Sequence, residues 1–372
     1  MMSWLIPKPL SVWCLSLSEH IYYTEQYYGK RMETSSDLQT SASSCSMPRS
    51  VPRSVTEALS LVHPEVTKRF FGCGLPFPAK LEGCRVLDLG SGSGRDCFAF
   101  SKLVGPSGHV TGIDMTTELI TVSRQYVEYH QKKFGYEKPN VSFVQGYMEK
   151  LGEAGIQSDS IDVVLSNCVI CLCPDKRAVL QQAYNVLKEG GELYFSDMYA
   201  SSVIPDHLKQ DPVLWGEGMG GSLFWRDLIS LAQDIGFSTP LLVSASLIVV
   251  HNSELKAKAG DISYVSGTYR LFKPPKSPVA TKATVTYKGT VADFPDQLKF
   301  DSSHCFKKDE AVEVDAEMAT ILQSSRFNSD FEIQMLDKQP CCESAPQYCH
   351  LNPFLLADKL GSSVKQCSKT GK

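Results

Sequence analysis

One short stretch constrains the fold of this chain more than any other, and it reads Arg85-Val-Leu-Asp-Leu-Gly-Ser-Gly-Ser-Gly-Arg-Asp96. An aliphatic run enters a turn with glycine at every second position, and an amphipathic segment follows. This pattern predicts a strand, a tight loop and a helix. Because glycine has no Cβ, a ligand can approach the amide groups at the start of the helix. The stretch therefore predicts the first half of a nucleotide-binding βα unit.

The glycine spacing separates two kinds of ligand. A dinucleotide fingerprint G-x-G-x-x-G that begins at Gly90 or at Gly92 lacks its third glycine. The remaining pattern, Asp88 followed by alternating glycines, resembles the S-adenosylmethionine loop of class I methyltransferases. A second predicted strand, His109–Asp114, ends in a carboxylate that can accept hydrogen bonds from both ribose hydroxyls. We therefore expect S-adenosylmethionine as the cofactor.

Strands and helices alternate from about residue 82 to residue 237, which predicts the α/β class with a doubly wound, Rossmann-like parallel sheet. Ligands of such sheets lie at the carboxyl ends of the strands. This rule brings Cys168, which follows the fourth predicted strand, close to the cofactor. The same rule gives the candidate cofactor-binding residues, which are Asp88, Gly90, Ser91, Gly92, Gly94, Asp114, Met115, Gly146, Tyr147 and Asn167.

Changes of composition divide the rest of the chain. We expect an unstructured extension over 1–20, a helical arm over 21–81, the methyltransferase domain over 82–237, a smaller β-rich α+β domain over 238–337 and a mobile, cysteine-containing tail over 338–372. Short runs of alternating apolar residues predict the strands of the C-terminal domain. The polar composition of the last segment predicts the tail.

Charge and cysteine content restrict the partners. The 372 residues carry a formal net charge of −4 and no lysine- or arginine-rich run, so we expect no nucleic acid partner. The apolar start of the chain is too short and too interrupted for a membrane span, and it lacks the pattern of a signal peptide. Thirteen cysteines in this setting indicate reduced thiols. We expect a cytoplasmic (cytosolic) monomer with a small-molecule substrate and no membrane partner.

Three cysteines follow the fourth predicted strand closely, at Cys168, Cys171 and Cys173. A zinc knuckle is one alternative, but no second cysteine pair follows at a fixed spacing. Another is that the side chains are small buried hydrophobes. If the strand continued, Cys171 and Cys173 would share one face and Cys168 would point to the other. The pattern alone thus leaves the role of the segment open.

Several motifs beyond the glycine loop make the resemblance more specific. Over roughly residues 27–336 the sequence closely resembles arsenite methyltransferases. The motifs that carry this resemblance are Arg69-Phe-Phe-Gly-Cys-Gly-Leu75, Leu87-Asp-Leu-Gly-Ser-Gly-Ser-Gly-Arg-Asp-Cys97, Gly112-Ile-Asp-Met115, Gly146-Tyr-Met-Glu-Lys-Leu-Gly152, Ser166-Asn-Cys-Val169, Gly191-Glu-Leu-Tyr-Phe-Ser-Asp197, Leu214-Trp-Gly-Glu217 and Thr268-Tyr-Arg-Leu-Phe-Lys273.

The resemblance implies a reaction. A methyl group passes from S-adenosylmethionine to thiol-bound trivalent arsenic, which converts arsenite to mono- and dimethylated arsenicals and serves arsenic detoxification. The substrates implied are arsenite or its thiol conjugates. A thiol reductant, thioredoxin or glutathione, acts as co-substrate and partner, and no metal cofactor is expected.

The resemblance also assigns cysteines, and the chain departs from the family pattern at two of them. Cys73 and Cys168 match thiolates that bind arsenic(III), and Cys45 resembles a redox thiol of the family but lies slightly further along the chain. The third arsenic ligand should follow Trp-Gly-Glu, where this chain has Gly218. The usual redox partner is replaced by Ile262.

Several explanations stay open for a site with two of its expected thiols. An exogenous thiol such as glutathione completes the arsenic ligands, or Cys171 or Cys173 substitutes, which the opposite faces of a continued strand disfavour. Alternatively, the chain binds S-adenosylmethionine and metalloid with weak or no turnover. A methyltransferase for a carbon, nitrogen or oxygen atom of a small molecule is a further class. That class predicts a general base, for which Asp197 and Glu217 are the candidates.

Overall fold

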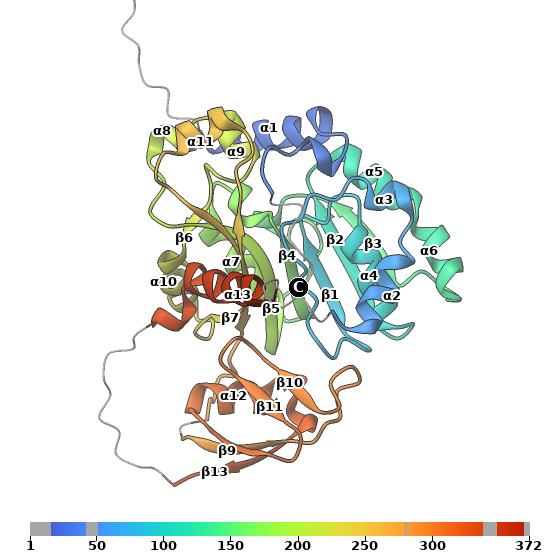
Figure 1. The fold of residues 1–372 in the computed structure, drawn as a ribbon. Helices are drawn as coiled ribbons and strands as arrows, with labels where there is room; N and C mark the ends of the chain where they lie inside the picture. The colour runs from blue at the N-terminus through green and yellow to red at the C-terminus, as the bar shows by residue number, and fades with distance from the viewer. Residues whose placement is uncertain (1–15, 42–50, 280, 338–347, 368–372) are drawn as a thin grey trace, which may run out of the picture.

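A mixed sheet forms the centre of the molecule (Figure 1). The computed structural model describes residues 16–41, 51–279, 281–337 and 348–367. Strands β1 to β5 run parallel, β8 and β7 extend the sheet in antiparallel fashion, and β6 pairs with the end of β5. In spatial order the strands are β3 (Val141–Gln145), β2 (His109–Asp114), β1 (Arg85–Leu89), β4 (Ile161–Asn167), β5 (Leu187–Ala200), β8 (Tyr264–Phe272) and β7 (Leu241–Ile248), with β6 (Leu223–Phe224) beside β5.

Helices cover both faces of this sheet. They are α2 (Arg53–Ser60), α3 (Pro64–Thr67), α4 (Arg95–Val104), α5 (Thr117–Gln125), α6 (Val127–Phe134), α7 (Lys176–Val186), α10 (Trp225–Ile235) and α13 (Pro353–Cys367). Strand residues alternate between two apolar layers, as the pleat requires. Val86 packs with α2 and α4 on one face, whereas Leu87 and Leu89 pack with α7 and α10 on the other. This arrangement confirms the predicted doubly wound α/β class, with two antiparallel strands added at one edge.

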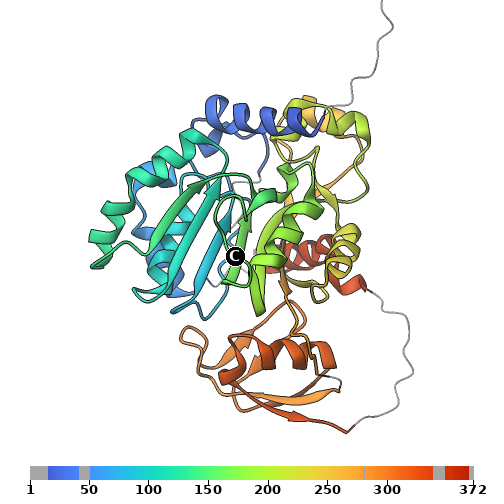
Figure 2. The ribbon, with the colours of Figure 1, turned by 180° about the vertical axis from the view of Figure 1, so that it is seen from behind.

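The top of the molecule carries several short helices (Figures 1 and 2). These are α1 (Leu17–Gln26), the π-helical turn η1 (Tyr27–Arg31), the 3-10 turn η2 (Ser35–Asp37), α8 (Asp206–Lys209), α9 (Pro212–Gly216) and α11 (Ser253–Ala259). Further 3-10 turns are η4 (Met148–Lys150) and η5 (Ile170–Leu172). Helix α1 starts at Leu17 because Ser16 and Glu19 form a capping box. The expected unstructured extension therefore cannot reach residue 20, and residues 1–15 lie outside the described residues.

The chain from Leu241 to Phe272, which the expected division places in the C-terminal domain, belongs instead to the central sheet. The alternation of β7 was visible in the sequence, but its partner β8 is buried along its whole length. Alternation says nothing about which sheet a strand joins. The β-rich part of the structure begins after β8 and lies at the bottom of the molecule in both ribbon views (Figures 1 and 2).

This C-terminal part has its own apolar core. Its elements are the sheet β12 (Ala311–Val314), β9 (Ala283–Tyr287) and β13 (Phe331–Met335), the pair β10 (Gln297–Lys299) and β11 (Cys305–Lys307), helix α12 (Ala316–Ser324) and the turn η6 (Asn328–Asp330). A buried charge cluster ties it to the central sheet. Glu192 on β5 pairs with Arg270 on β8 and with Arg326 from the C-terminal part.

The segment expected to be a mobile tail is partly ordered. The turn η7 (Tyr348–Leu351) and helix α13 (Pro353–Cys367) pack onto β7, and Leu351 and Ala357 are buried in the main core. The phenol of Tyr269 donates a hydrogen bond to the carbonyl of Leu351, 2.8 Å away. The polar residues of this segment concealed a short apolar stripe. Among the helices in the described ranges, none is long and apolar enough to cross a membrane.

Candidate active site

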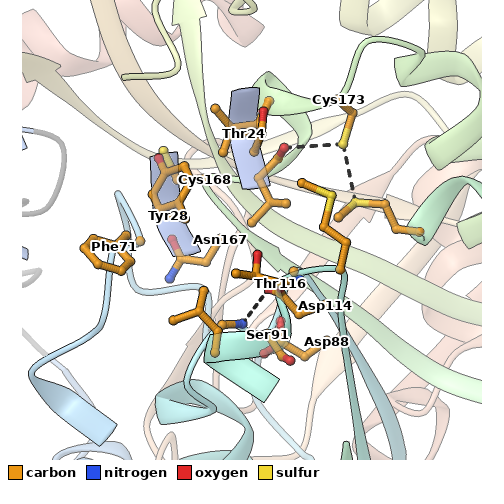
Figure 3. A pocket seen from close by; sticks show the side chains of 18 of the residues that line it. Thr24, Tyr28, Phe71, Asp88, Ser91, Asp114, Thr116, Asn167, Cys168 and Cys173 are labelled. Carbon is orange, nitrogen blue, oxygen red and sulfur yellow. Dashed lines mark hydrogen bonds between the residues drawn. The ribbon is translucent and has the colours of Figure 1, made fainter. Parts of the chain in front are cut away.

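A pocket lies at the carboxyl ends of the parallel strands, beneath the N-terminal arm (Figure 3). It contains about 930 Å³ of empty space, including its open mouth. The residues predicted from sequence that line it are Asp88, Gly90, Ser91, Gly92, Asp114, Met115, Gly146, Tyr147, Asn167 and Cys168. The structure thus brings these residues together around one cavity.

The glycine loop needs its glycines for different reasons. Gly90 has φ +69°, and a Cβ there would lie 2.4 Å from the side chain of Val169. Gly92 has φ +54°, faces open space, and donates its amide to Oδ2 of Asp114 at 2.9 Å. Gly94 does not line the pocket. It caps helix α4 with φ +91° and packs against Phe143.

Asp114 holds the loop and the next segment together. Its second oxygen accepts a hydrogen bond from the amide of Thr116 at 2.8 Å. The carboxylate is almost fully buried, and burial raises its pKa. Nearby, the buried hydroxyl oxygen of Ser91 has no hydrogen-bond partner among the described residues. The pocket therefore presents an acceptor and an unpaired hydroxyl to a ligand.

Carboxyl groups dominate the charged lining of the pocket, which contains Asp88, Asp96, Asp114 and Glu149. Burial, aided by the nearby carboxyl of Asp96, raises the pKa of Asp88 to about 8. Burial also raises the pKa of Glu149. A cationic ligand would favour the charged forms of these groups, whereas a pyrophosphate would be repelled. The lining fits a sulfonium cofactor and disfavours a dinucleotide.

The N-terminal arm supplies lining that the sequence did not predict. Ile21, Thr24 and Tyr28 lie over the pocket, and residues 69–72 close one side. The phenol of Tyr28 donates to the carbonyl of Gly216 at 2.9 Å, and its ring packs edge-on against Phe71. Nothing in the sequence marks Ile21, Thr24 or Tyr28, because their role depends on where the arm folds back.

Cys73 and Cys168 lie close together although 95 positions separate them in the chain. Asn167 joins their segments. Its amide accepts from the amide of Gly74 and donates to the carbonyl of Gly74, both at 3.1 Å, and it also donates to Asp96 at 2.9 Å. Cys73 is fully buried, whereas Cys168 is partly exposed and lines the pocket.

Cys168 occupies an unusual backbone conformation, with φ +61°. The left-handed conformation costs a non-glycine residue on the order of 1–3 kcal/mol, and such residues are concentrated at functional sites. A backbone hydrogen bond from its amide to the carbonyl of Ser196, 2.8 Å long, fixes it there. Its thiol lies within hydrogen-bonding reach of Cys171 and Cys73, and these contacts, with burial, raise the pKa of Cys168.

The expected opposition of Cys168 and Cys171 is wrong. After Cys168 the chain does not continue as a strand but turns into η5. The left-handed conformation of Cys168, followed by this turn, changes the direction of the chain between Cys168 and Cys171. The sulfur atoms of Cys168 and Cys171 and a carboxylate oxygen of Asp197 accordingly lie within 4.8 Å of one another. Cys173 points elsewhere, toward Met148 and the carbonyl of Val169 (Figure 3).

The two candidate general bases lie outside the pocket lining. Glu217 accepts from the phenol of Tyr27 at 2.6 Å and from the amide of Gln39, so it anchors the arm. Asp197 lines a second, smaller cavity and accepts hydrogen bonds from the amides of Cys171 and Met198. Glu149, which the sequence did not mark as a candidate base, does line the pocket.

Two further sequence expectations have different outcomes. Cys45, the candidate redox thiol, lies outside the described residues. Ile262, at the position of its expected partner, packs against the apolar cluster that contains Cys73 and Cys171.

Known proteins resemble this chain over both of its parts. Residues 80–236 match a family described as a methyltransferase domain, and residues 280–372 match the arsenite methyltransferase C-terminal domain. The arsenite methyltransferase of Mus musculus is 52% identical over 84% of this chain and 83% of its own length. That of Homo sapiens is 48% identical over 92% of each chain.

A solved structure gives the same result. The crystal structure of an arsenic(III) S-adenosylmethionine methyltransferase from Chlamydomonas reinhardtii is 40% identical in sequence and superimposes with a TM-score of 0.73. The match covers 77% of this chain and 97% of that chain. With these similarities extending over both the glycine-loop domain and the C-terminal part, the chain belongs to the arsenite methyltransferase family.

Proposed function

We propose that this chain is an enzyme that transfers a methyl group from S-adenosylmethionine to trivalent arsenic held by Cys73 and Cys168. One observation carries the proposal. Two thiols from distant segments meet beside a pocket whose glycine loop and buried carboxyl groups suit a sulfonium cofactor. The family supports both the cofactor and the arsenic substrate.

The cofactor would be held by the glycine loop and by residues at the ends of the strands. Gly92 and Asp114 shape the turn, and Asp114 presents carboxylate oxygens where the second strand ends. Met115, Gly146 and Tyr147 complete that side of the pocket. When bound, S-adenosylmethionine supplies the methyl group, so that a carbon–arsenic bond forms as the carbon–sulfur bond breaks.

The thiols would bind the substrate by exchange. Arsenite is a soft, thiophilic centre, and softness matching favours sulfur ligands over carboxylate or imidazole. Each exchange breaks an As–OH bond and an S–H bond, forms an As–S bond and releases water. The lone pair of the bound arsenic then remains free to attack, so the chemistry requires no general base. This agrees with the positions of Asp197 and Glu217, which do not line the pocket.

Positioning supplies much of the acceleration in this proposal. Two reactants held in attack geometry avoid an entropic cost on the order of 7–11 kcal/mol. The clamp of Asn167 on the Cys73 segment fixes one reactant relative to the other. Transfer consumes the arsenic lone pair and leaves arsenic(V), which needs two electrons for a return to arsenic(III).

The reductant is proposed as thioredoxin or glutathione, which returns those electrons by thiol–disulfide exchange. We further propose that the chain works as a cytosolic monomer without a metal cofactor, a nucleic acid partner or a membrane partner. The net charge of −4 and the eight free cysteines found among the described residues are consistent with a reduced, small-molecule setting.

The test is the conversion of S-adenosylmethionine by the purified full-length chain with and without arsenite, in the presence of a thiol reductant. We expect S-adenosylhomocysteine to appear only with arsenite, together with methylated arsenic. Cofactor binding without any stimulation by arsenite would sink the proposal. Conversion driven by another small-molecule acceptor would place the chain in a different methyltransferase class.

A further inference from the structure

The cluster around Cys168 contains one thiol that the family resemblance does not assign. We infer that Cys171 supplies the third sulfur ligand of arsenic(III), beside Cys73 and Cys168, in place of a side chain at position 218. This inference rests on the proposed function, because it names the ligands of the same substrate.

The first support is the shape of the cluster. The sulfur atoms of Cys168 and Cys171 lie within 4.8 Å of each other, and the thiol of Cys168 also interacts with that of Cys73. The η5 turn directs Cys171 toward Cys168, and the Asn167 clamp holds the Cys73 segment on the remaining side. Three-coordinate arsenic holds its sulfurs at the corners of a triangle. The mutually close ligand atoms are those of Cys168, Cys171 and Asp197, so arsenite binding would draw the sulfur of Cys73 toward the Cys168–Cys171 pair.

The second support is the surroundings of Gly218. A Cβ built at this glycine would lie 3.0 Å from the sulfur of Cys171, with the methyl group of Met198 next at 3.6 Å. A thiol carried by position 218 would therefore enter the corner that the Cys171 sulfur already occupies. A thiol at position 218 and a thiol at position 171 would therefore occupy the same ligand position. This chain has the thiol at 171 and a glycine at 218.

The other candidate ligands fit less well. Asp197 belongs to the cluster, but its oxygens already accept hydrogen bonds from the amides of Cys171 and Met198. A carboxylate is also a hard ligand for a soft centre. Cys173 donates toward the sulfur of Met148 at 3.4 Å, away from Cys168. Asp197 thus positions Cys171, and Cys173 stays outside the cluster.

The route into the cluster is consistent with stepwise exchange. Cys168 lines the cofactor pocket, whereas Cys171 lines a small cavity behind it and Cys73 is fully buried. Arsenite entering through the pocket meets Cys168 first and then exchanges with its two neighbours. Overall, three As–OH and three S–H bonds break, three As–S bonds form and three waters leave, so no net charge is buried.

The experiment counts sulfur ligands by arsenic K-edge X-ray absorption on the arsenite-bound, full-length chain. A phosphine keeps the thiols reduced without offering sulfur to arsenic. Cysteines outside the cluster that could bind arsenic are first changed to serine in the full-length chain, namely Cys14, Cys45, Cys305, Cys341, Cys342, Cys349 and Cys367. In this parent we expect three sulfur atoms around arsenic.

Two variants of the parent sharpen the result. Cys171→Ser should lower the count to two sulfurs and one oxygen, whereas Cys84→Ser, a matched change of a buried cysteine elsewhere, should keep three. Three sulfurs in Cys171→Ser, or two in the parent, would overturn the inference. If Cys171→Ser fails to fold, as judged by thermal melting, Cys171→Ala takes its place, and two sulfurs in the parent would overturn the inference without either variant.

The outcomes also separate this inference from the proposed function. If the parent shows two sulfurs around arsenic, and one of them is lost when Cys168 is changed, the proposed function stands. Only the assignment of Cys171 as a ligand is then rejected. An absence of arsenic–sulfur scattering in the parent would remove both.

Discussion

The two halves of the site are built in different ways. The cofactor half centres on the glycine loop after β1, whose Gly92 amide donates to Asp114 at the end of the neighbouring strand β2. The thiol half collects Cys73, Cys168 and the Gly218 corner from three separate segments. A local motif carries its geometry in its sequence, whereas an assembled cluster depends on how distant segments meet. The sequence of the cofactor half therefore identifies the methyl donor. The substrate that accepts the methyl group is determined by the thiol half.

The strongest separation of the halves is expected from Cys168→Ser. Loss of an outer-shell partner alone costs roughly 10- to 100-fold in metal affinity or activity, so loss of a direct ligand should lower arsenite methylation by at least about 100-fold. Binding of S-adenosylhomocysteine, measured by calorimetry, should stay unchanged. Retained arsenite affinity in this variant would remove Cys168 from the substrate site. Cys305→Ser, an exposed cysteine, is the control.

The mirror image is Asp114→Ala in the cofactor half. This carboxylate accepts hydrogen bonds from the amides of Gly92 and Thr116, and hydrogen bonds to charged groups contribute about 1.5–3 kcal/mol. We expect cofactor affinity to fall roughly 10- to 100-fold. The number of sulfur atoms around bound arsenic should not change. Equal losses of both ligands would show that the halves are not independent.

Asn167→Ala tests the joint between the halves. The variant loses the hydrogen bonds to Gly74 and Asp96, and so frees the segment that carries Cys73. We expect arsenite affinity to fall about tenfold, equivalent to about 1.4 kcal/mol, with a smaller effect on the cofactor. Asn185→Ala, an exposed change on α7, controls for the loss of an amide. A variant with unchanged arsenite titration would mean that the clamp does not position Cys73.

The smallest effect is expected from Gly218→Ala. Position 218 has φ +78°, where a side-chain residue costs about 1–2 kcal/mol, and the added Cβ crowds Cys171. We expect lower thermal stability and a modest loss of arsenite affinity. Gly152→Ala serves as control, because its Cβ would meet no atom within 4 Å. If Gly218→Ala melts like the parent, the crowding at this corner is overstated.

Much of the fold was predictable, because buried strands and amphipathic helices leave local patterns. The helix after the glycine loop and the strand His109–Asp114 follow such patterns and occur as expected. Where the prediction failed, the cause was the tertiary packing of segments that lie far apart in the sequence. Strands β7 and β8 joined the central sheet, and α13 docked onto β7. Strand partners and docking sites leave no local periodicity.

The site shows the same division. Residues on the strand ends could be placed around a cavity from topology alone, since parallel strands end at one edge. The placement of Tyr28 over the pocket and the position of Cys171 could not be predicted in this way. The first depends on where the arm folds back, and the second on a left-handed residue, Cys168, that turns the strand into η5. A glycine at this position would have indicated a left-handed turn, because glycine commonly adopts this conformation, whereas a cysteine gives no such indication.

The most direct test follows the methyl group itself. Arsenite is bound to the full-length chain at equal concentration, and one equivalent of S-adenosylmethionine with a ¹³C-labelled methyl group is added with thiol reductant. We expect the label to appear on arsenic, with one S-adenosylhomocysteine formed for each methylated arsenic. Label that stays on the cofactor, or that appears on a cysteine of the protein, would contradict it.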